Sequence, residues 1–183
     1  MEEALELSVR EIEKKDIDLI TDYWLNADPE FLKGMGVDLQ KLPSRSSFKD
    51  MLTRQIETPY QEKKSYALIW LANDIEVGHS NVNEIEYGKQ AKMHLHLWNS
   101  GQRKKGLGSE LLAKTLPLYF RNLKLEVLWC EPYAKNPAPN RTLDRAGFEF
   151  VKRYITVPGS LNFEQEVNRW KLTREKFNGL ELN

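Results

Sequence analysis

The fold of this chain is decided by residues 92–108, which read KMHLHLWNSGQRKKGLG. Apolar and polar side chains alternate through residues 92–98, which is typical of a half-buried strand. Gly106 and Gly108 let the backbone turn with its N–H groups facing inward, and residues 109–120 carry the apolar stripe of a helix. A helix N-terminus adds about half a positive charge, so the strand, turn and helix together predict a site for a diphosphate.

Positive charge is concentrated in the same loop, at Arg103, Lys104 and Lys105. A purely structural turn does not need three adjacent cations, whereas a site for an anion does. A Walker loop is excluded because no Lys-Ser/Thr pair follows Gly106. A dinucleotide fingerprint is excluded because it would lie near the first strand of its domain, and this loop lies about halfway along the chain. A solvated basic turn is the remaining alternative.

Other segments have the periodicity of strands and helices. Asn73-Asp74 predicts a two-residue hairpin turn and Tyr87-Gly88-Lys89 predicts the next reversal, so the strands around them form an antiparallel meander. Strands joined through helices in the second half predict parallel pairing, and hence a mixed sheet. The predicted strands are 5–11, 66–72, 75–82, 92–98, 123–130, 148–154 and 170–173, and the predicted helices are 16–24, 46–55, 109–120 and 139–146.

The composition indicates one globular domain over residues 1–183, because 40% of the side chains are apolar and 30% charged. Lys plus Arg and Asp plus Glu both total 27, so nothing draws the whole surface to nucleic acid. Cys130 is the single cysteine, and the N-terminus lacks the basic and apolar regions of a signal peptide. No apolar run approaches the roughly 20 residues that span a bilayer. We therefore expect a cytoplasmic protein without membrane contact.

Two motifs in the second half of the chain belong together. Arg103, Gly106 and Gly108 form an Arg-x-x-Gly-x-Gly pattern between a predicted strand and its helix. Asn136 is followed eleven residues later by Gly147-Phe148. At this separation the motifs resemble the GNAT superfamily of N-acetyltransferases, and the resemblance runs from about residue 68 to residue 154.

The segment Cys130-Glu131-Pro132 resembles the branch of this superfamily that includes ribosomal-protein N-terminal acetyltransferases. The resemblance implies an α/β fold with a mixed, mostly antiparallel sheet of six to seven strands, flanked by helices and splayed between the fourth and fifth strands. It also implies acetyl-CoA (coenzyme A) as co-substrate, with the pantetheine arm in the splay. The residues implied to contact the coenzyme are Leu97, Trp98, Asn99, Arg103, Lys104, Lys105, Gly106, Leu107, Gly108, Ser109, Asn136 and Arg145.

Acyl transfer to an amine needs a base, because the acceptor is an ammonium whose own pKa lies well above neutral. His94 and His96 lie two residues apart on the predicted fourth strand, so both side chains face the same side next to the loop. Glu131, at the end of the fifth strand, is the next choice. Packing of the histidines among aromatic neighbours, and bonding of Glu131 to backbone amides, are the alternatives.

The usual general acid of the family is missing. Many relatives carry a tyrosine seven residues after the asparagine, where this chain has Leu143. Another branch uses a serine three residues after it, where this chain has Pro139. Tyr133 is the remaining choice for the acid, and simple packing is its alternative. Cys130 lies inside a predicted strand without a histidine partner, so we expect direct transfer and no acyl-enzyme.

The resemblance therefore predicts an N-acetyltransferase that moves an acetyl group from acetyl-CoA to a primary amine on a small molecule or a protein N-terminus. A non-catalytic acyl-CoA-binding or sensing domain is the alternative, because both customary acids are absent. A nucleic-acid-binding module would need a basic face, which zero net charge does not favour. No metal is expected, since His94 and His96 have no third ligand nearby. A homodimer stays possible, because relatives often dimerise.

Overall fold

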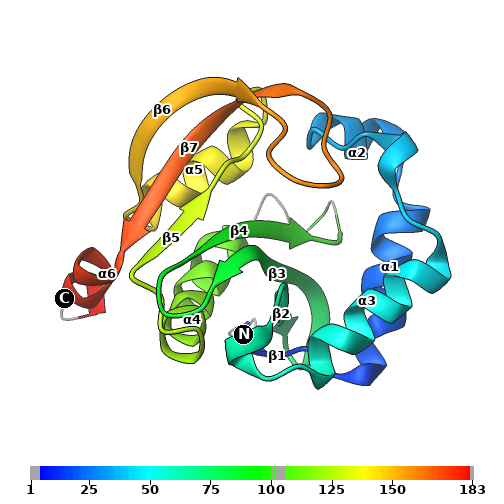
Figure 1. Cartoon of the computed structure of the whole chain (residues 1–183), viewed down its shortest axis with the longest axis horizontal. Coiled ribbons are helices and arrows are strands. Elements are labelled where there is room, and N and C mark those ends of the chain that lie inside the picture. Colours follow the sequence, from blue (N-terminus) through cyan, green and yellow to red (C-terminus); the bar gives the residue numbers. More distant parts are fainter. Residues whose placement is uncertain (1–4, 100, 102–105, 182–183) are drawn as a thin grey trace.

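The computed structural model of the chain describes residues 5–99, 101 and 106–181. Their strands form one seven-stranded sheet in the order β1-β2-β3-β4-β5-β7-β6 (Figure 1). The strands are β1 (Leu7–Glu11), β2 (Tyr66–Ala72), β3 (Ile75–Glu86), β4 (Gln90–Leu97), β5 (Val127–Cys130), β6 (Glu149–Thr156) and β7 (Gln165–Thr173). Only β4 and β5 run parallel among these neighbours, so the sheet is mixed and mostly antiparallel, as predicted.

Six α-helices and three short 3-10 helices accompany the described strands. The α-helices are α1 (Ile17–Asn26), α2 (Pro29–Gly34), α3 (Arg45–Glu57), α4 (Leu107–Asn122), α5 (Pro137–Arg145) and α6 (Arg174–Glu181). The 3-10 helices are η1 (Lys14–Asp16), η2 (Leu39–Lys41) and η3 (Tyr60–Glu62). The predicted hairpin turn is confirmed at Asn73 and Asp74, whose φ angles of 49° and 61° are those of a primed turn.

Strand β2 shows why helices are needed on both sides of the sheet, since all seven of its residues are buried. Its odd-numbered side chains, such as Ile69, pack with Ile20 of α1 and Leu52 of α3. Its even-numbered side chains, such as Leu68, pack with Leu112 of α4. The period-two alternation of a strand thus divides the core into two layers, and in Figure 1 α1 and α3 lie side by side, away from α4.

Helix α2 follows Asp28, between the predicted helices 16–24 and 46–55. The Asp28 carboxylate accepts hydrogen bonds from the amides of Glu30 at 2.7 Å and Phe31 at 3.3 Å. Pro29 then occupies the first helical turn, where its missing N–H costs nothing. An N-cap followed by proline is a helix start signal, and it produces one short helix here.

The second half of the sheet contains two corrections. Strand β7 begins at Gln165, five residues before the predicted strand, because it pairs with β6 as well as with β5. The predicted parallel pairing of strands joined through helices is confirmed for β4 and β5, but β5 and β6 do not pair with each other, because β7 lies between them and is antiparallel to both. Helix α6, which was not predicted, follows β7 directly.

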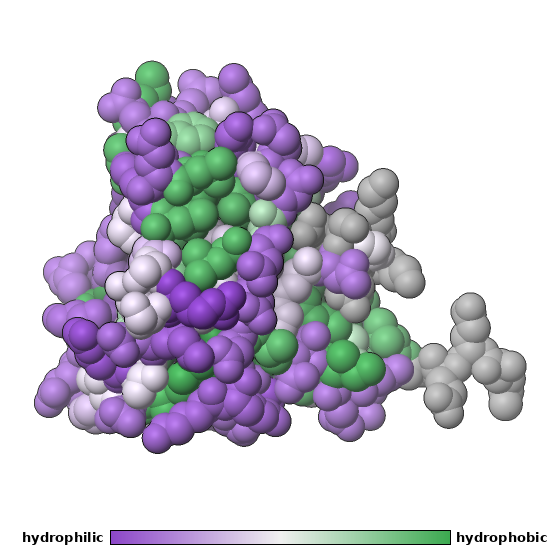
Figure 2. Space-filling view, turned by 90° about the vertical axis from the view of Figure 1, so that its right-hand side faces the viewer, coloured by the Kyte–Doolittle hydropathy of each residue, from purple (hydrophilic) through white to green (hydrophobic). Residues whose placement is uncertain are grey.

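The side of the molecule that carries α1, α2 and α3 faces the viewer in Figure 2, where apolar side chains gather between polar ones. Leu19 of α1 and Met51 of α3 are 41% and 44% exposed. Single exposed apolar residues are common, but these two lie at the edges of two hollows that are described below.

Candidate active site

Strands β4 and β5 separate before β4 ends. Their parallel ladder runs from the Gln90–Val127 pair to the Met93–Cys130 pair. Strand β4 continues beside β3 to the Gly78–Leu97 pair. The ladder with β5 therefore stops four residues before the end of β4, which confirms the predicted splay between the fourth and fifth strands.

Helix α4 begins at the splay. Its N-cap, Gly106, has a φ of 74°, a left-handed conformation that favours glycine. The amides of a first helical turn have no acceptor within their own helix, although the Ser109 amide does donate to the Gly106 carbonyl at 3.2 Å. Leu107 and Gly108 lie in the same turn, at an end that suits an anion. The predicted contacts Arg103, Lys104 and Lys105 lie outside the described residues.

The end of β4, the start of α4 and the middle of α5 converge at Gly108. A Cβ added to Gly108 would lie 3.8 Å from Thr142 Oγ1 and 3.9 Å from Leu97 Cδ1. Arg145 follows Thr142 by three residues, so it lies on the same side of α5. Asn136 is the N-cap of α5, without a side-chain cap bond, at the opposite end of the helix. The predicted coenzyme contacts are therefore divided between these elements around the splay.

The two predicted histidines belong to a cluster of three. His94 pairs with Asn81 of β3 and His96 pairs with His79 of β3, so all of these side chains lie on one face of the sheet. The rings of His79 and His96 stack with centroids 4.8 Å apart. His79 was not predicted. Trp98, predicted as a backbone contact of the coenzyme, donates its Nε1–H to His79 Nδ1 at 2.8 Å, so its indole belongs to this cluster.

Burial keeps two of these imidazoles neutral. It lowers the pKa of His79 to about 3, with a smaller contribution from His94. It lowers the pKa of His94 to about 4, where the neighbouring Lys92 adds to the effect and Glu131 opposes it. At neutral pH both rings are therefore uncharged, and the unprotonated nitrogen of each ring can accept a hydrogen bond.

His96 contacts helix α1 through Tyr23. The Tyr23 hydroxyl lies 3.1 Å from His96 Nδ1 and 3.6 Å from Met35 Sδ. Trp24 meets the same imidazole edge-on, with ring centroids 4.9 Å apart. These contacts fix the orientation of the His96 ring, which is what a group that handles protons requires.

A cavity of about 380 Å³, here called the histidine cavity, lies over this face of β3 and β4. Its floor carries the histidine cluster and Asn83, its walls come from α1 and α3, and residues 159–162 lie at its rim. The described lining residues are Ile20, Trp24, Met35, Val37, Pro43, Phe48, Met51, Leu52, Gln55, Lys64, Ser65, Ala67, His79, Asn81, Asn83, His94, His96, Gly159, Ser160, Leu161 and Asn162.

Glu131, the second choice for the base, is held by charged partners. Its side chain is 1% exposed, and Oε1 lies 3.1 Å from Lys92 Nζ and 3.4 Å from Arg169 Nη1. The Tyr154 hydroxyl donates to Oε2. Two cations and a hydroxyl thus hold this carboxylate in place.

Tyr133, the predicted acid, and Leu143, at the position of the family tyrosine, have different surroundings. Tyr133 follows β5, forms a bridge with Val167 of β7 and packs edge-on against Phe163 with centroids 5.8 Å apart. Leu143 is completely buried in the core. The position of the family tyrosine is thus filled by a core residue, whereas Tyr133 lies beside the splay.

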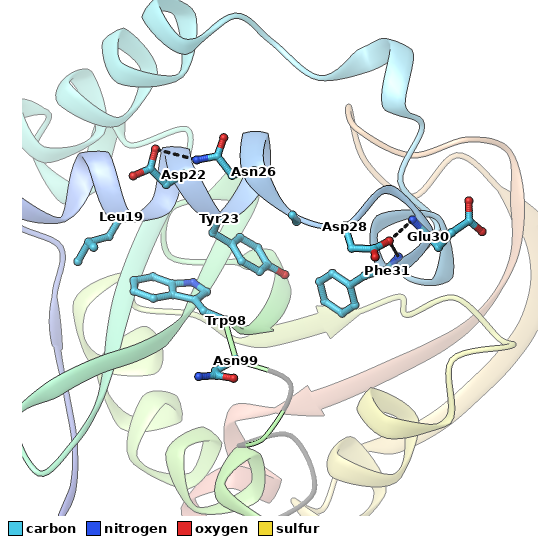
Figure 3. A pocket seen from close by; sticks show the side chains of 10 residues that line it. Leu19, Asp22, Tyr23, Asn26, Asp28, Glu30, Phe31, Trp98 and Asn99 are labelled. Atoms are coloured by element: carbon cyan, nitrogen blue, oxygen red, sulfur yellow. Dashed lines mark hydrogen bonds between the residues drawn. The ribbon is translucent and has the colours of Figure 1, made fainter.

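A second hollow of about 730 Å³, here called the acidic cleft, lies between α1, α2 and the end of β4 (Figure 3). The rings of Tyr23, Phe31 and Trp98 converge in it, with Tyr23 6.4 Å from each of the other two. Its described lining residues are Leu19, Asp22, Tyr23, Asn26, Ala27, Asp28, Glu30, Phe31, Trp98 and Asn99.

Each carboxylate of the acidic cleft has a partner. Asp22 pairs with Arg45 at 2.7 Å, and Glu30 pairs with Lys33 at 2.8 Å. Asp28 caps α2. Figure 3 also shows the Glu30 carboxylate pointing away from the aromatic rings. The charge of this cleft is therefore largely compensated by neighbouring groups.

Two absences concern the described residues only. No helix in 5–99, 101 and 106–181 is long and apolar enough to cross a membrane. Within the same ranges, no three His, Cys, Asp or Glu side chains are grouped so that they could hold a metal ion, although three histidines are close together.

A mixed sheet that opens beside a helix N-terminus is the arrangement that the resemblance to the GNAT superfamily implies. The family model for the acetyltransferase (GNAT) domain matches residues 6–149. The chain belongs to this family, and it is an acetyl-CoA-dependent acyltransferase. No curated protein matches the chain at the level of sequence.

Solved structures share the fold over nearly the whole chain. Spermidine N-acetyltransferase from Vibrio cholerae, in complex with CoA and spermine, has a TM-score of 0.76 at 15% identity, covering 94% of this chain and 98% of the other. The ribosomal L7/L12 alpha-N-protein acetyltransferase RimL, in complex with coenzyme A, has a TM-score of 0.74 at 18% sequence identity, covering 93% of this chain and 95% of the other. Aminoglycoside acetyltransferase AAC(6')-Ib, in complex with coenzyme A, has a TM-score of 0.71 at 17% sequence identity, covering 96% of this chain and 99% of the other. At these identities the likeness concerns the fold.

Proposed function

We propose that this chain transfers the acetyl group of acetyl-CoA to a primary amine that approaches β4 from the histidine cavity. The observation that carries the proposal is the early end of the β4–β5 ladder at Met93 and Cys130. Beyond this point β5 no longer pairs with β4, and the His94–His96 face of β4 lines the cavity. The coenzyme and the amine can therefore reach the same four residues of β4 from different directions.

The residues around the splay fit the coenzyme. The amides at the start of α4, at Leu107 and Gly108, would receive the pyrophosphate, together with the predicted contact Ser109. The backbone of Leu97, Trp98 and Asn99 would contact the pantetheine arm, with Asn136 and Arg145 on the α5 side. The coenzyme, when bound, supplies a thioester whose carbonyl carbon is the electrophile.

His94 is our first choice for the proton acceptor. Its Nε2 is buried, lines the histidine cavity and has no hydrogen-bond partner among the described residues. The ring is neutral at pH 7 because burial holds its pKa at about 4. His96, oriented by Tyr23, is the second choice, and either imidazole could act through a water molecule.

Glu131 is our proposal for a positioning residue, because its carboxylate is tied to Lys92 at 3.1 Å and to Arg169 at 3.4 Å. Lys92 also donates to the Pro158 carbonyl at 3.1 Å, so the same network holds the segment that precedes the cavity rim. Tyr133 remains our proposal for the acid that protonates the leaving thiolate.

Direct transfer is supported by the state of Cys130. Burial raises the pKa of its thiol to about 12, and Sγ donates to the Met93 carbonyl at 3.1 Å. A thiol with this pKa is almost entirely protonated at neutral pH, so it is a poor nucleophile. An acyl-enzyme on this residue is therefore disfavoured.

Release of free thiol from acetyl-CoA, measured across a panel of amines, tests the proposal. We expect His94→Ala or His96→Ala to lower kcat by about 10²–10⁴-fold, the usual contribution of a general base, with unchanged affinity for the coenzyme. Glu131→Gln should have a smaller effect on kcat than the variant of the true base. Binding of coenzyme A without thiol release from any amine would refute the transfer.

That last outcome would favour the second candidate, a non-catalytic acyl-CoA-binding domain. A specific observation supports it, namely that core residue Leu143 occupies the position of the family acid. Calorimetry measures coenzyme binding separately from turnover. We expect Arg145→Ala to weaken binding by about five- to tenfold, as for one charge-assisted contact, whereas Lys114→Ala, an exposed cation two turns into α4, should not.

A further inference from the structure

The histidine cavity has a polar floor and an apolar wall. The floor consists of side chains from β3 and β4, which lie on one face of the sheet because they alternate along each strand. The facing wall includes Trp24, Phe48 and Leu52, and the first two rings stack with centroids 6.4 Å apart. A ligand that fills this cavity therefore needs one polar end and one apolar body.

Two atoms of the floor lack hydrogen-bond partners among the described residues. They are Asn83 Oδ1 and His94 Nε2, and both are buried. The register pairs His94 with Asn81, so Asn83 and His94 are diagonal neighbours on the same face. Buried polar atoms are rarely left without partners, so two of them at one place in a cavity indicate a ligand group or waters. An amine can donate N–H groups to both.

The charge of the cavity limits which amines can enter. None of its described lining residues is an aspartate or a glutamate, and Lys64 is the one charged side chain among them, exposed at the rim. A second or third ammonium group would lose its water here without meeting a carboxylate, which is unfavourable. The volume of about 380 Å³ corresponds to about a dozen liquid waters, enough for a small apolar body.

We propose that the acceptor is a primary monoamine with an apolar body, whose amino group is recognised by Asn83 and His94 on the floor of the histidine cavity. The inference rests on the proposed function for its location beside β4, and it adds the class of the acceptor. Polycations are excluded by the absence of a carboxylate from the described lining. The acidic cleft is the alternative place for a polycation, although its carboxylates already have partners.

Two probes with the same six-carbon chain separate these cases. n-Hexylamine and 1,6-diaminohexane differ only in the second ammonium group, and Trp24 in the cavity wall reports binding through its fluorescence. We expect n-hexylamine to bind at least about tenfold more tightly, ~1.4 kcal/mol. Equal or tighter binding of the diamine would overturn the inference.

Variants of Asn83 should act in opposite directions. Asn83→Leu removes the acceptor at similar size and should weaken n-hexylamine by about tenfold, whereas Asn83→Asp supplies a carboxylate and should tighten it by about three- to tenfold. Glu30→Gln in the acidic cleft is the control and should leave its affinity unchanged. The assignment would be contradicted if both Asn83 variants changed the affinity for n-hexylamine in the same direction, or if Glu30→Gln changed it at all. If Asn83→Leu does not fold, the Asn83→Asp result decides.

Thiol release separates this inference from the proposed function. If n-hexylamine binds as expected but no thiol is released, recognition by Asn83 and His94 stands and acetyl transfer is refuted. If 1,6-diaminohexane is acetylated and n-hexylamine is neither bound nor acetylated, acetyl transfer stands and the acceptor class is wrong.

Discussion

Acidification should destabilise this protein through His79. Its side chain is 2% exposed, and burial lowers its pKa from 6.5 to about 3. Between these values the unfolded chain binds the proton and the folded chain does not, so stability is lost as the pH falls. At pH 4.5, two units below the unfolded pKa, the loss is on the order of 3 kcal/mol, since each unit is worth ~1.4 kcal/mol.

Urea unfolding of the wild type and of His79→Asn, each at about pH 7 and about pH 4.5, isolates this contribution. Asparagine does not titrate, and it keeps an acceptor near the position of Nδ1 for the indole of Trp98. Stability that is lost on acidification through the carboxylates and through His94 is lost in both proteins, so it largely cancels when the two are compared. The wild type should therefore lose about 3 kcal/mol more than the variant between the two pH values. Equal losses would refute the reasoning, because His79 would then titrate at its ordinary pKa.

Three further predictions concern the splay and its surroundings. Gly106→Ala should lower the free energy of unfolding by about 1–2 kcal/mol, because the φ of Gly106 is 74°. Gly108→Ala should leave the free energy of unfolding unchanged or raise it, because there is room for the added Cβ in the helix. Thermal unfolding of the two variants measures the difference. Cys130 should react with iodoacetamide far more slowly in the folded than in the urea-unfolded chain, because burial raises the pKa of its thiol to about 12. Mass spectrometry measures both rates of alkylation, and equal rates would contradict the prediction. Leu143→Tyr should lower the free energy of unfolding by about 1–3 kcal/mol through overpacking, without faster thiol release.

The order of the elements could be predicted from the sequence where local signals are strong. Asn73-Asp74 fixes a hairpin because both residues tolerate a positive φ, and the alternation in 92–98 fixes β4. The start of β7 could not be found, because residues 165–169 have no strong alternation and are ordered by pairing with β6. The direction of β7 is likewise a tertiary property, since it depends on which neighbour is available.

The candidate site was predicted on β4 and missed on β3. His94 and His96 stand out because they adjoin the glycine-bearing loop, whereas His79 is far from it in sequence. A signal was present, since His79, Asn81 and Asn83 place polar side chains at every second position of a strand in the middle of a sheet. Such a polar row on a buried face costs free energy unless it is paired or binds something.

The shortness of the β4–β5 ladder has a consequence for stability. Four residue pairs join the half of the sheet formed by β1–β4 to the half formed by β5–β7, so this junction has few main-chain bonds to lose. A molecule seated between the two halves would touch both and oppose their separation. Saturation at about 100 times its dissociation constant would add ~2.7 kcal/mol to the free energy of unfolding, so the melting temperature itself would report occupancy.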